Sequence, residues 1–299
     1  MREAPLAVCT ADWHLCLKPP VARSTEPDWL KTQRGYLDQV FSLARKYDVP
    51  VLHAGDVLDR WNSPPELINF CLEVMEEVWA VPGNHELPNH SLAEVRRSAY
   101  WTLVQAGKVK NLTGSVTFRD RLRVWGFPWG VEPTPCPEPH DLYVEVCLCH
   151  KYMWTKGTGY PGAPESGRVS LVQDQFKGYD FVVSGDNHQS FCVAREGTTF
   201  VNAGSLMRRT SDQIDFLPGV WLVFGDNTVE RVDIDVSGDR FVPTGKEPQG
   251  NPLTDFREFS QALRDVRGDT LDFDEALERV IRDGRLTDGT VKTLRELTR

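Results

Sequence analysis

Five short clusters of aspartate, asparagine and histidine are the parts of this chain best suited to chemistry. They are, in chain order, Asp12-Trp13-His14, Gly55-Asp56-Val57-Leu58-Asp59-Arg60, Gly83-Asn84-His85-Glu86, Cys149-His150 and Gly185-Asp186-Asn187-His188. Divalent cations accept carboxylate and imidazole ligands, and an amide can add a neutral oxygen. Two cations about 3.5–4 Å apart can share a hydroxide and hold both the attacking and the leaving oxygen of a phosphate ester. The clusters therefore predict a site for divalent cations.

Each cluster taken alone has an ordinary explanation. An Asp-x-His pair occurs by chance in many proteins, and the segment 55–60 can form a turn closed by an arginine–carboxylate pair. A single histidine such as His150 after a strand is often only a hydrogen-bonded structural residue. The joint presence of all the clusters favours metal binding. His53, His90 and His140 fall outside them and are predicted to be structural or surface residues.

The segment before each cluster has the composition of a short buried strand. These segments are residues 6–10, 49–54, 79–81, 143–149 and 181–184, all rich in valine, leucine, phenylalanine or cysteine. Ligands in open α/β folds gather outside the carboxyl ends of the strands. We therefore expect the five clusters to meet in one crevice.

Further periodic segments indicate the class of fold. Apolar residues at helical spacing predict helices over residues 36–46 and 67–78, and a hairpin is expected from strands at 116–118 and 122–127. Later strands are expected at residues 191–194, 199–202 and 220–224. Strands that alternate with helices and then follow one another predict a layered α/β sandwich with partly mixed sheets.

The chain divides into three predicted parts. Residues 1–240 form the catalytic domain, residues 241–252 form a linker rich in proline and glycine, and residues 253–299 form a small helical C-terminal region. That region either packs on the catalytic domain or docks a partner. Inside the first part, the glycine- and proline-rich loop 155–167 is expected to be mobile.

Composition restricts the class of protein. The chain has 299 residues and a net charge of −9. It has no apolar run near the roughly 20 residues that span a bilayer, and its first residues lack the layout of a signal peptide. We expect a cytoplasmic protein with no membrane partner. The acidic balance disfavours a broad basic nucleic-acid footprint, although two bound cations would bring positive charge to the site itself.

In order and spacing, the five clusters resemble the motifs of the calcineurin-like metallophosphoesterase superfamily, over residues 5–225. The resemblance implies an α/β/β/α sandwich of two mixed sheets. It also implies one metal held by Asp12, His14, Asp56 and His188, and a second held by Asp56, Asn84, His150 and residue 186, with Asp56 as the bridge. His85 would donate a proton to the leaving group or stabilise charge in the transition state.

The last cluster departs from the pattern of this family, which has Gly-His-x-His where this chain has Gly-Asp-Asn-His. Asp186 would place a third carboxylate beside the two cations. Manganese or magnesium is therefore favoured over zinc, with manganese first and iron also a candidate. The alternative is that Asp186 points away and water takes its position.

The segment from Phe200 to Arg209 resembles the Asn-Pro-Gly-Ser segment of the SbcD-like DNA repair exonucleases, a branch with many phage members. This resemblance implies a nuclease of DNA repair or recombination, with an SbcC-like ATPase as a partner through the C-terminal helices. Ser205, Arg208 and Arg209 would contact the DNA. Arg60 is expected to steady the site through Asp59 or a ligand carboxylate rather than to contact phosphate directly. The alternative for residues 205–209 is a turn at the end of a strand with solvated arginines.

Two other functions stay open. A phosphodiesterase or phosphatase for a small molecule, such as a cyclic nucleotide, agrees with the acidic composition. A non-catalytic scaffold is disfavoured because Asp56, Asn84 and His85 are all present. The sequence does not decide between exonuclease and endonuclease action, and it is compatible with a homodimer.

Overall fold

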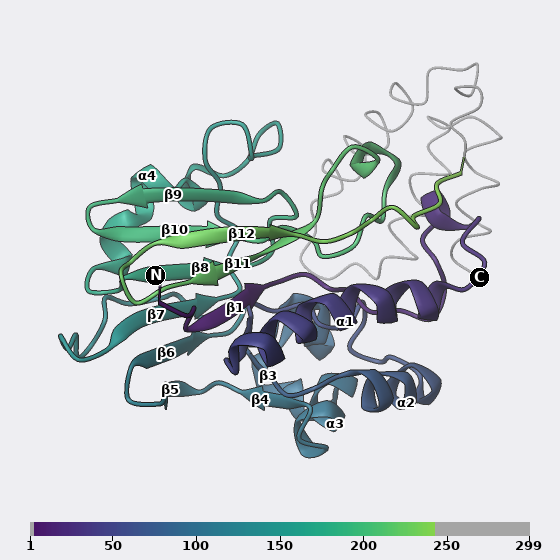
Figure 1. Cartoon of the computed structure of the whole chain (residues 1–299), viewed down its shortest axis with the longest axis horizontal. Helices are drawn as coiled ribbons and strands as arrows, with labels where there is room; N and C mark the ends of the chain where they lie inside the picture. The colour runs from purple at the N-terminus through teal and green to yellow at the C-terminus, as the bar shows by residue number, and fades with distance from the viewer. Residues whose placement is uncertain (1–2, 243–299) are drawn as a thin grey trace, which may run out of the picture. The chain divides into compact units, whose positions relative to one another are not determined.

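The computed structural model describes residues 3–242, which form two six-stranded sheets packed face to face (Figure 1). The first sheet has the order β12-β11-β1-β2-β3-β4. Its strands β1 to β4 are parallel, and β11 and β12 are antiparallel to their neighbours. The bounds are β1 Ala7–Thr10, β2 Val51–His53, β3 Val78–Ala80, β4 Val109–Asn111, β11 Gly219–Val223 and β12 Val229–Asp233.

The second sheet has the order β5-β6-β7-β8-β10-β9 and is also mixed. Strands β6, β7, β8 and β10 run parallel, while β5 and β9 are antiparallel edge strands. The bounds are β5 Gly114–Phe118, β6 Leu122–Phe127, β7 Val144–Cys149, β8 Phe181–Ser184, β9 Phe191–Arg195 and β10 Thr198–Asn202.

Alternating side chains divide the interior into separate cores. In β1, Ala7 and Cys9 face the second sheet, whereas Val8 faces the helices. In β7, Leu148 faces the first sheet and Cys147 faces outward. Because successive side chains of a strand point to opposite faces, strands apolar on both faces must be covered on both. This explains why inner strands such as β1, β7 and β8 are nearly continuous apolar runs, whereas the edge strands β5 and β12 are not.

Helices cover the outer face of each sheet (Figure 1). Helices α1, α2 and α3 pack on the first sheet, and α4 packs on the second. Their bounds are α1 Trp29–Tyr47, α2 Pro65–Val74, α3 Ala99–Gln105 and α4 Val169–Val172. Short 3-10 turns lie at η1 Val21–Arg23, η2 Asn84–Glu86, η3 Pro88–His90, η4 Leu92–Arg97, η5 Glu165–Gly167, η6 Gln173–Phe176 and η7 Ser211–Gln213.

The predicted fold class is confirmed, since the layers are helix, sheet, sheet and helix. Differences lie in the element ends. Helix α1 begins at Trp29 rather than at residue 36, because the Asp28 carboxylate caps it by accepting from the Lys31 N–H. Helix α2 ends at Val74, ahead of residue 78. Strands β4 and β12 and helix α3 were not predicted.

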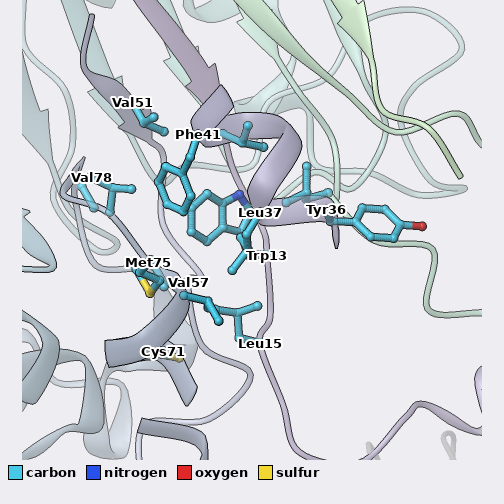
Figure 2. Close-up of a cluster of buried hydrophobic side chains, with 14 of the residues drawn as sticks. Trp13, Leu15, Tyr36, Leu37, Phe41, Val51, Val57, Cys71, Met75 and Val78 are labelled. Carbon is cyan, nitrogen blue, oxygen red and sulfur yellow. The ribbon is translucent and has the colours of Figure 1, made fainter. Parts of the chain in front are cut away.

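Trp13 is the central side chain of the core between the first sheet and its helices (Figure 2). It is fully buried, and its ring meets Phe41 of α1 edge to face at 5.9 Å between centroids. Its indole N–H donates to the Thr10 hydroxyl at 2.9 Å. Trp13 therefore fixes the short segment that carries Asp12 and His14 on either side of it.

The end of the described chain is held by a buried ionic cluster. The Asp239 carboxylate accepts from the Tyr36 hydroxyl at 2.6 Å and from Arg208 at 2.7 Å, and it pairs with Arg23 at 2.7 Å. Beyond it, the Val242 N–H donates to the Ala22 carbonyl. Residues 241 and 242 of the predicted linker thus lie against the catalytic domain. The rest of the linker and the predicted helices of residues 253–299 lie outside the described residues.

Between residues 3 and 242, no helix is both long and apolar enough to span a membrane.

The packing of Trp13 predicts how Phe41→Ala affects stability. Removing this buried ring should lower the free energy of unfolding by about 3–5 kcal/mol, because the cavity beside Trp13 cannot be refilled. Urea unfolding followed by circular dichroism measures the change. Leu171→Ala is the matched control, since Leu171 is 61% exposed and its loss should change stability little. A Phe41→Ala variant as stable as the wild type would contradict the central role of this contact.

Candidate metal centre

Five strands run toward the same edge of the sandwich, and the predicted clusters follow them directly. Strands β1, β2 and β3 lead to residues 12–14, 56 and 84–85, and strands β7 and β8 lead to residues 150 and 186–188. The Asp12 N–H donates to the Gly55 carbonyl at 3.0 Å, and the His14 N–H donates to the Asp56 carbonyl at 2.9 Å. The loops after β1 and β2 are therefore bonded to each other as well as to their strands.

Several of these residues adopt an unusual backbone. The φ angles are 51° at Asp12, 47° at His14, 62° at Asp56 and 72° at Asp186. Residues other than glycine rarely adopt positive φ, and such positions concentrate at functional sites. Each bend turns a side chain off the line of its strand and toward the common crevice.

Gly55, in the loop after β2, lies very close to the side chain of His150. Its φ is 95°, and a Cβ atom there would lie 2.3 Å from Nδ1 of His150. Glycine is the residue that meets both demands, because it tolerates positive φ and lacks a side chain.

Glu86 joins the loop after β2 to the loop after β3. Its buried carboxylate accepts from the N–H groups of Asp56 at 3.0 Å, Leu58 at 2.9 Å and Gly83 at 2.7 Å. Burial and the nearby Asp56 carboxylate raise the pKa of Glu86 to about 8. Glu86 was not among the predicted site residues. Its place in the Gly-Asn-His-Glu cluster was visible in the sequence, but its partners at 56 and 58 come from another strand.

One group of acceptors forms around His150. Its Nδ1 lies 2.6 Å from the Ala54 carbonyl, which can only accept, so Nδ1 carries the proton. In the neutral ring, Nε2 then carries a lone pair. This atom lies 3.1 Å from Oδ1 of Asn84 and 3.5 Å from Oδ2 of Asp56. When the ring is neutral these three atoms are all acceptors, and only a proton on Nε2 or a cation can join them. A cation satisfies such a group.

A second group forms around His14. Its Nε2 lies 3.1 Å from Nε2 of His188 and 3.6 Å from Oδ2 of Asp56. Oδ2 of Asp12 and Nδ1 of His14 are buried without a hydrogen-bond partner. Buried polar atoms of folded proteins are nearly always paired, so unpaired ones point to a partner such as an ion.

The ligand atoms of two residue sets lie within 4.8 Å of one another: Asp12 with His14 and His188, and Asp12 with Asp56 and His150. A third set of this kind joins His14, Asp59 and His85. Carboxylate, imidazole and amide donors suit manganese, iron, zinc or magnesium. The residues present therefore fit a divalent metal centre. Asp56 lies within 4.0 Å of His14, His85 and His150, the position expected of a shared ligand.

The electrostatics of the crevice attract positive charge. Burial opposes an imidazolium at His150, but the carboxylates of Asp56, Asp12 and Asp186 outweigh it and raise the pKa of His150 to about 9. Burial, with the charges of Asp56 and Asp186, also raises the pKa of Asp12 above its ordinary value. A proton or a metal ion thus binds favourably among these groups, and metal binding should release protons.

His85 stands at the opening of the crevice. Its Nδ1 lies 2.6 Å from the Asp59 carbonyl, which fixes the ring, and its side chain is 38% exposed. The backbone N–H of His85 donates to Oδ1 of Asp56 at 3.1 Å, and the ring atom Nε2 lies 4.0 Å from Oδ2 of Asp56. Nε2 is therefore the ring nitrogen turned toward the acceptor groups.

Arg209 borders the same opening. Its guanidinium pairs with the Asp59 carboxylate at 2.6 Å and donates to the His14 carbonyl at 3.2 Å, and its side chain is 20% exposed. The arginine that steadies Asp59 is therefore Arg209. Arg60, predicted for that role, is exposed.

Asp186 lies beside the two acceptor groups but belongs to neither. Its carboxylate is in none of the sets whose ligand atoms lie within 4.8 Å of one another. Its backbone N–H instead donates to Oδ1 of Asp12 at 3.1 Å, which orients that carboxylate. Metal ligation by the Asp186 side chain stays a prediction.

Two predicted substrate contacts are wrong. Ser205 is fully buried, and its hydroxyl accepts from the Gln213 side chain at 2.9 Å. Arg208 turns into the ionic cluster, where its three nitrogens bond Asp239 and the carbonyls of Ile214 and Val236. Neither side chain is free for DNA. Both instead hold the segment that passes behind His14.

Comparison with known proteins places the chain in one family. The family model of the calcineurin-like phosphoesterase superfamily domain matches residues 11–218. Similar solved structures include the TT1561 protein of Thermus thermophilus, with 13% identity, a TM-score of 0.46 and coverage of 78% of this chain and 100% of that one. Another is an archaeal phosphodiesterase, with 12% identity, a TM-score of 0.39 and coverage of 76% and 98%. Among curated proteins no match is found.

The unpaired acceptors predict the behaviour of Asp12→Asn. This variant should bind less metal and lose the rise in Tm that Mn2+ gives the wild type, because a carboxylate ligand is gone. After chelation it should be at least as stable as the wild type, since a buried charge has been removed. Elemental analysis and thermal unfolding with and without Mn2+ measure both effects.

Glu165→Gln serves as the control, because Glu165 is exposed and belongs to none of the sets of candidate ligands. Unchanged metal content in the Asp12→Asn variant would remove Asp12 from the ligand set.

Proposed function

Because the chain belongs to the calcineurin-like phosphoesterase superfamily, whose members are metal-dependent hydrolases, we propose that it cleaves phosphodiester bonds in DNA. The observation that carries the proposal is the placement of His85 at the opening of the crevice. Its ring is fixed through Nδ1, and Nε2 faces both the acceptor groups and solvent. A proton donor beside a cation site is what the departure of a leaving-group oxygen requires.

The chemistry assigns a task to each group. Divalent cations, when bound, would neutralise phosphate charge and lower the pKa of the attacking water. His85 in its protonated form donates the Nε2 proton to the leaving oxygen as the bond from phosphorus to that oxygen breaks. The Asp59 carbonyl fixes the orientation of the His85 ring through Nδ1, and the Arg209 guanidinium pairs with the Asp59 carboxylate. The water oxygen ends on phosphorus, and the leaving group departs as an alcohol.

Two features support DNA as the substrate. The segment 200–209 resembles that of SbcD-like repair nucleases, and the Arg209 side chain is 20% exposed beside the crevice. Although Ser205 and Arg208 do not reach the crevice, they fix the segment from which Arg209 projects. The proposal includes manganese as the native metal and an SbcC-like partner for residues 253–299.

The test of the proposed function is the His85→Ala variant with DNA as substrate. The wild type with Mn2+ should cleave linear single- or double-stranded oligonucleotides. His85→Ala should lower kcat by about 100- to 10,000-fold, the range typical of general acid catalysis. Metal content should stay unchanged, since His85 is outside the two main acceptor groups. His140→Ala is the matched control, because His140 is exposed and lies in none of the five clusters.

Two outcomes would contradict the proposal. Full activity of the His85→Ala variant would remove His85 from its role. Rapid cleavage of cyclic nucleotides or small phosphomonoesters, with DNA left intact, would favour the small-molecule alternative that the net charge of −9 allows.

Metal preference is tested by Asp186→His, which restores the residue usual in the family. If Asp186 ligates, the variant should shift the activity ratio from manganese toward zinc, because imidazole is a softer ligand than carboxylate. Histidine is among the residues that tolerate the positive φ of this position. Activity titrations with each metal measure the ratio. An unchanged ratio would mean that the carboxylate does not bind the metal.

A further inference from the structure

A hollow of about 750 Å³ adjoins the metal centre. On one side it is lined by Tyr152, Tyr160 and the glycines between them, and on the other by Asp186, His188 and Gln189. His188 is shared by the hollow and by the acceptor group around His14. A phosphate at the metal centre would therefore have one of its substituents in this hollow.

The wall of the hollow is held by specific bonds, although its glycines and prolines suggested a mobile loop. The buried Asn187 donates its side-chain N–H groups to the carbonyls of Met153 at 2.8 Å and Thr158 at 3.1 Å. The Trp154 N–H donates to the Gly167 carbonyl at 2.9 Å, which closes the base of the loop. Asn187 lies between the predicted ligands 186 and 188, so the loop is joined directly to the metal-binding turn.

Two aromatic rings of the hollow lie against each other. The rings of Tyr152 and Tyr160 lie 5.2 Å apart between centroids at 57°, and the Tyr152 hydroxyl accepts from the Tyr160 N–H at 3.3 Å. Tyr160 is nevertheless 56% exposed. Gly157 has open space where a Cβ would stand. A large aromatic side chain held in place yet exposed offers a stacking surface for a planar group.

We propose that this hollow binds the nucleobase next to the scissile phosphate, with Tyr160 stacking on the base and Tyr152 supporting Tyr160. The inference rests on the proposed phosphodiesterase function and adds a requirement for a base. Stacking is tolerant of sequence, because every base has a π face. Tyr160 is thus a specificity-determining residue for nucleotides over other phosphodiesters.

The test compares thymidylyl-thymidine with two analogues in which either the 5′ or the 3′ thymine is replaced by hydrogen. For one analogue, the wild type should show a KM about tenfold higher than for thymidylyl-thymidine. This factor is within the range that one base stacking on an aromatic side chain contributes. Tyr160→Ala should raise the KM for thymidylyl-thymidine by the same factor and should not change the KM for that analogue. Tyr160→Phe should behave as the wild type, and kcat should stay within about twofold throughout, since stacking is uniform binding.

Binding provides a readout without turnover. Calorimetry on the metal-loaded protein should show about tenfold tighter binding of thymidine 5′-monophosphate than of 2-deoxyribose 5-phosphate. The difference should disappear in Tyr160→Ala and persist in Leu171→Ala, a control that removes an exposed apolar side chain outside the hollow.

The outcomes distinguish a failure of the proposed base site from a failure of the proposed phosphodiesterase function. If the wild type cleaves all three dinucleotides with equal KM, or if Tyr160→Ala changes neither KM nor binding, the hollow is not a base site and the phosphodiesterase function stands. If the wild type cleaves none of them and no oligonucleotide, the proposed function fails and the base site fails with it.

Discussion

The buried carboxylate of Glu86 is the interaction on which the geometry of the crevice depends. By accepting three backbone N–H groups, it sets the distance between the loop that carries Asp56 and the loop that carries Asn84 and His85. These donors lie in the loops beyond β2 and β3, where the hydrogen bonds that pair the two strands have ended. A buried N–H without an acceptor costs about 1–3 kcal/mol. Three of them explain why a carboxylate is retained there despite the cost of burial.

The strained turns around the crevice are likewise stabilised by contacts with the surrounding structure. Positive φ angles at Asp12, His14 and Asp56 cost on the order of 1–3 kcal/mol each. The surrounding structure supports them through the backbone bonds between the β1 and β2 loops and through the buried ring of Trp13. The stable core on the helix side of the first sheet thus holds ligand positions that the local backbone would not adopt alone.

The sequence predicted the layers, most strands and the clusters that meet at their carboxyl ends, because these depend on local periodicity and on one topological rule. It could not predict the partners of individual side chains. Ser205 and Arg208 were assigned to the substrate because their segment resembles that of SbcD-like nucleases, but their side chains bond Gln213 and Asp239 instead. Likewise, the pairing of Arg209 with Asp59 joins residues 150 positions apart, which no local pattern encodes.

The net charge of −9 and an anionic substrate can be reconciled by the order of binding. The Arg209 guanidinium beside the crevice is already paired with Asp59, while the carboxylates of Asp12 and Asp56 lie within the acceptor groups. A phosphate approaching these groups alone would be repelled. Cations that bind first reverse the local charge, and local charge acts on the substrate more strongly than the distant, screened total. Under the proposed function, metal binding is therefore the step that would let the crevice accept a phosphodiester.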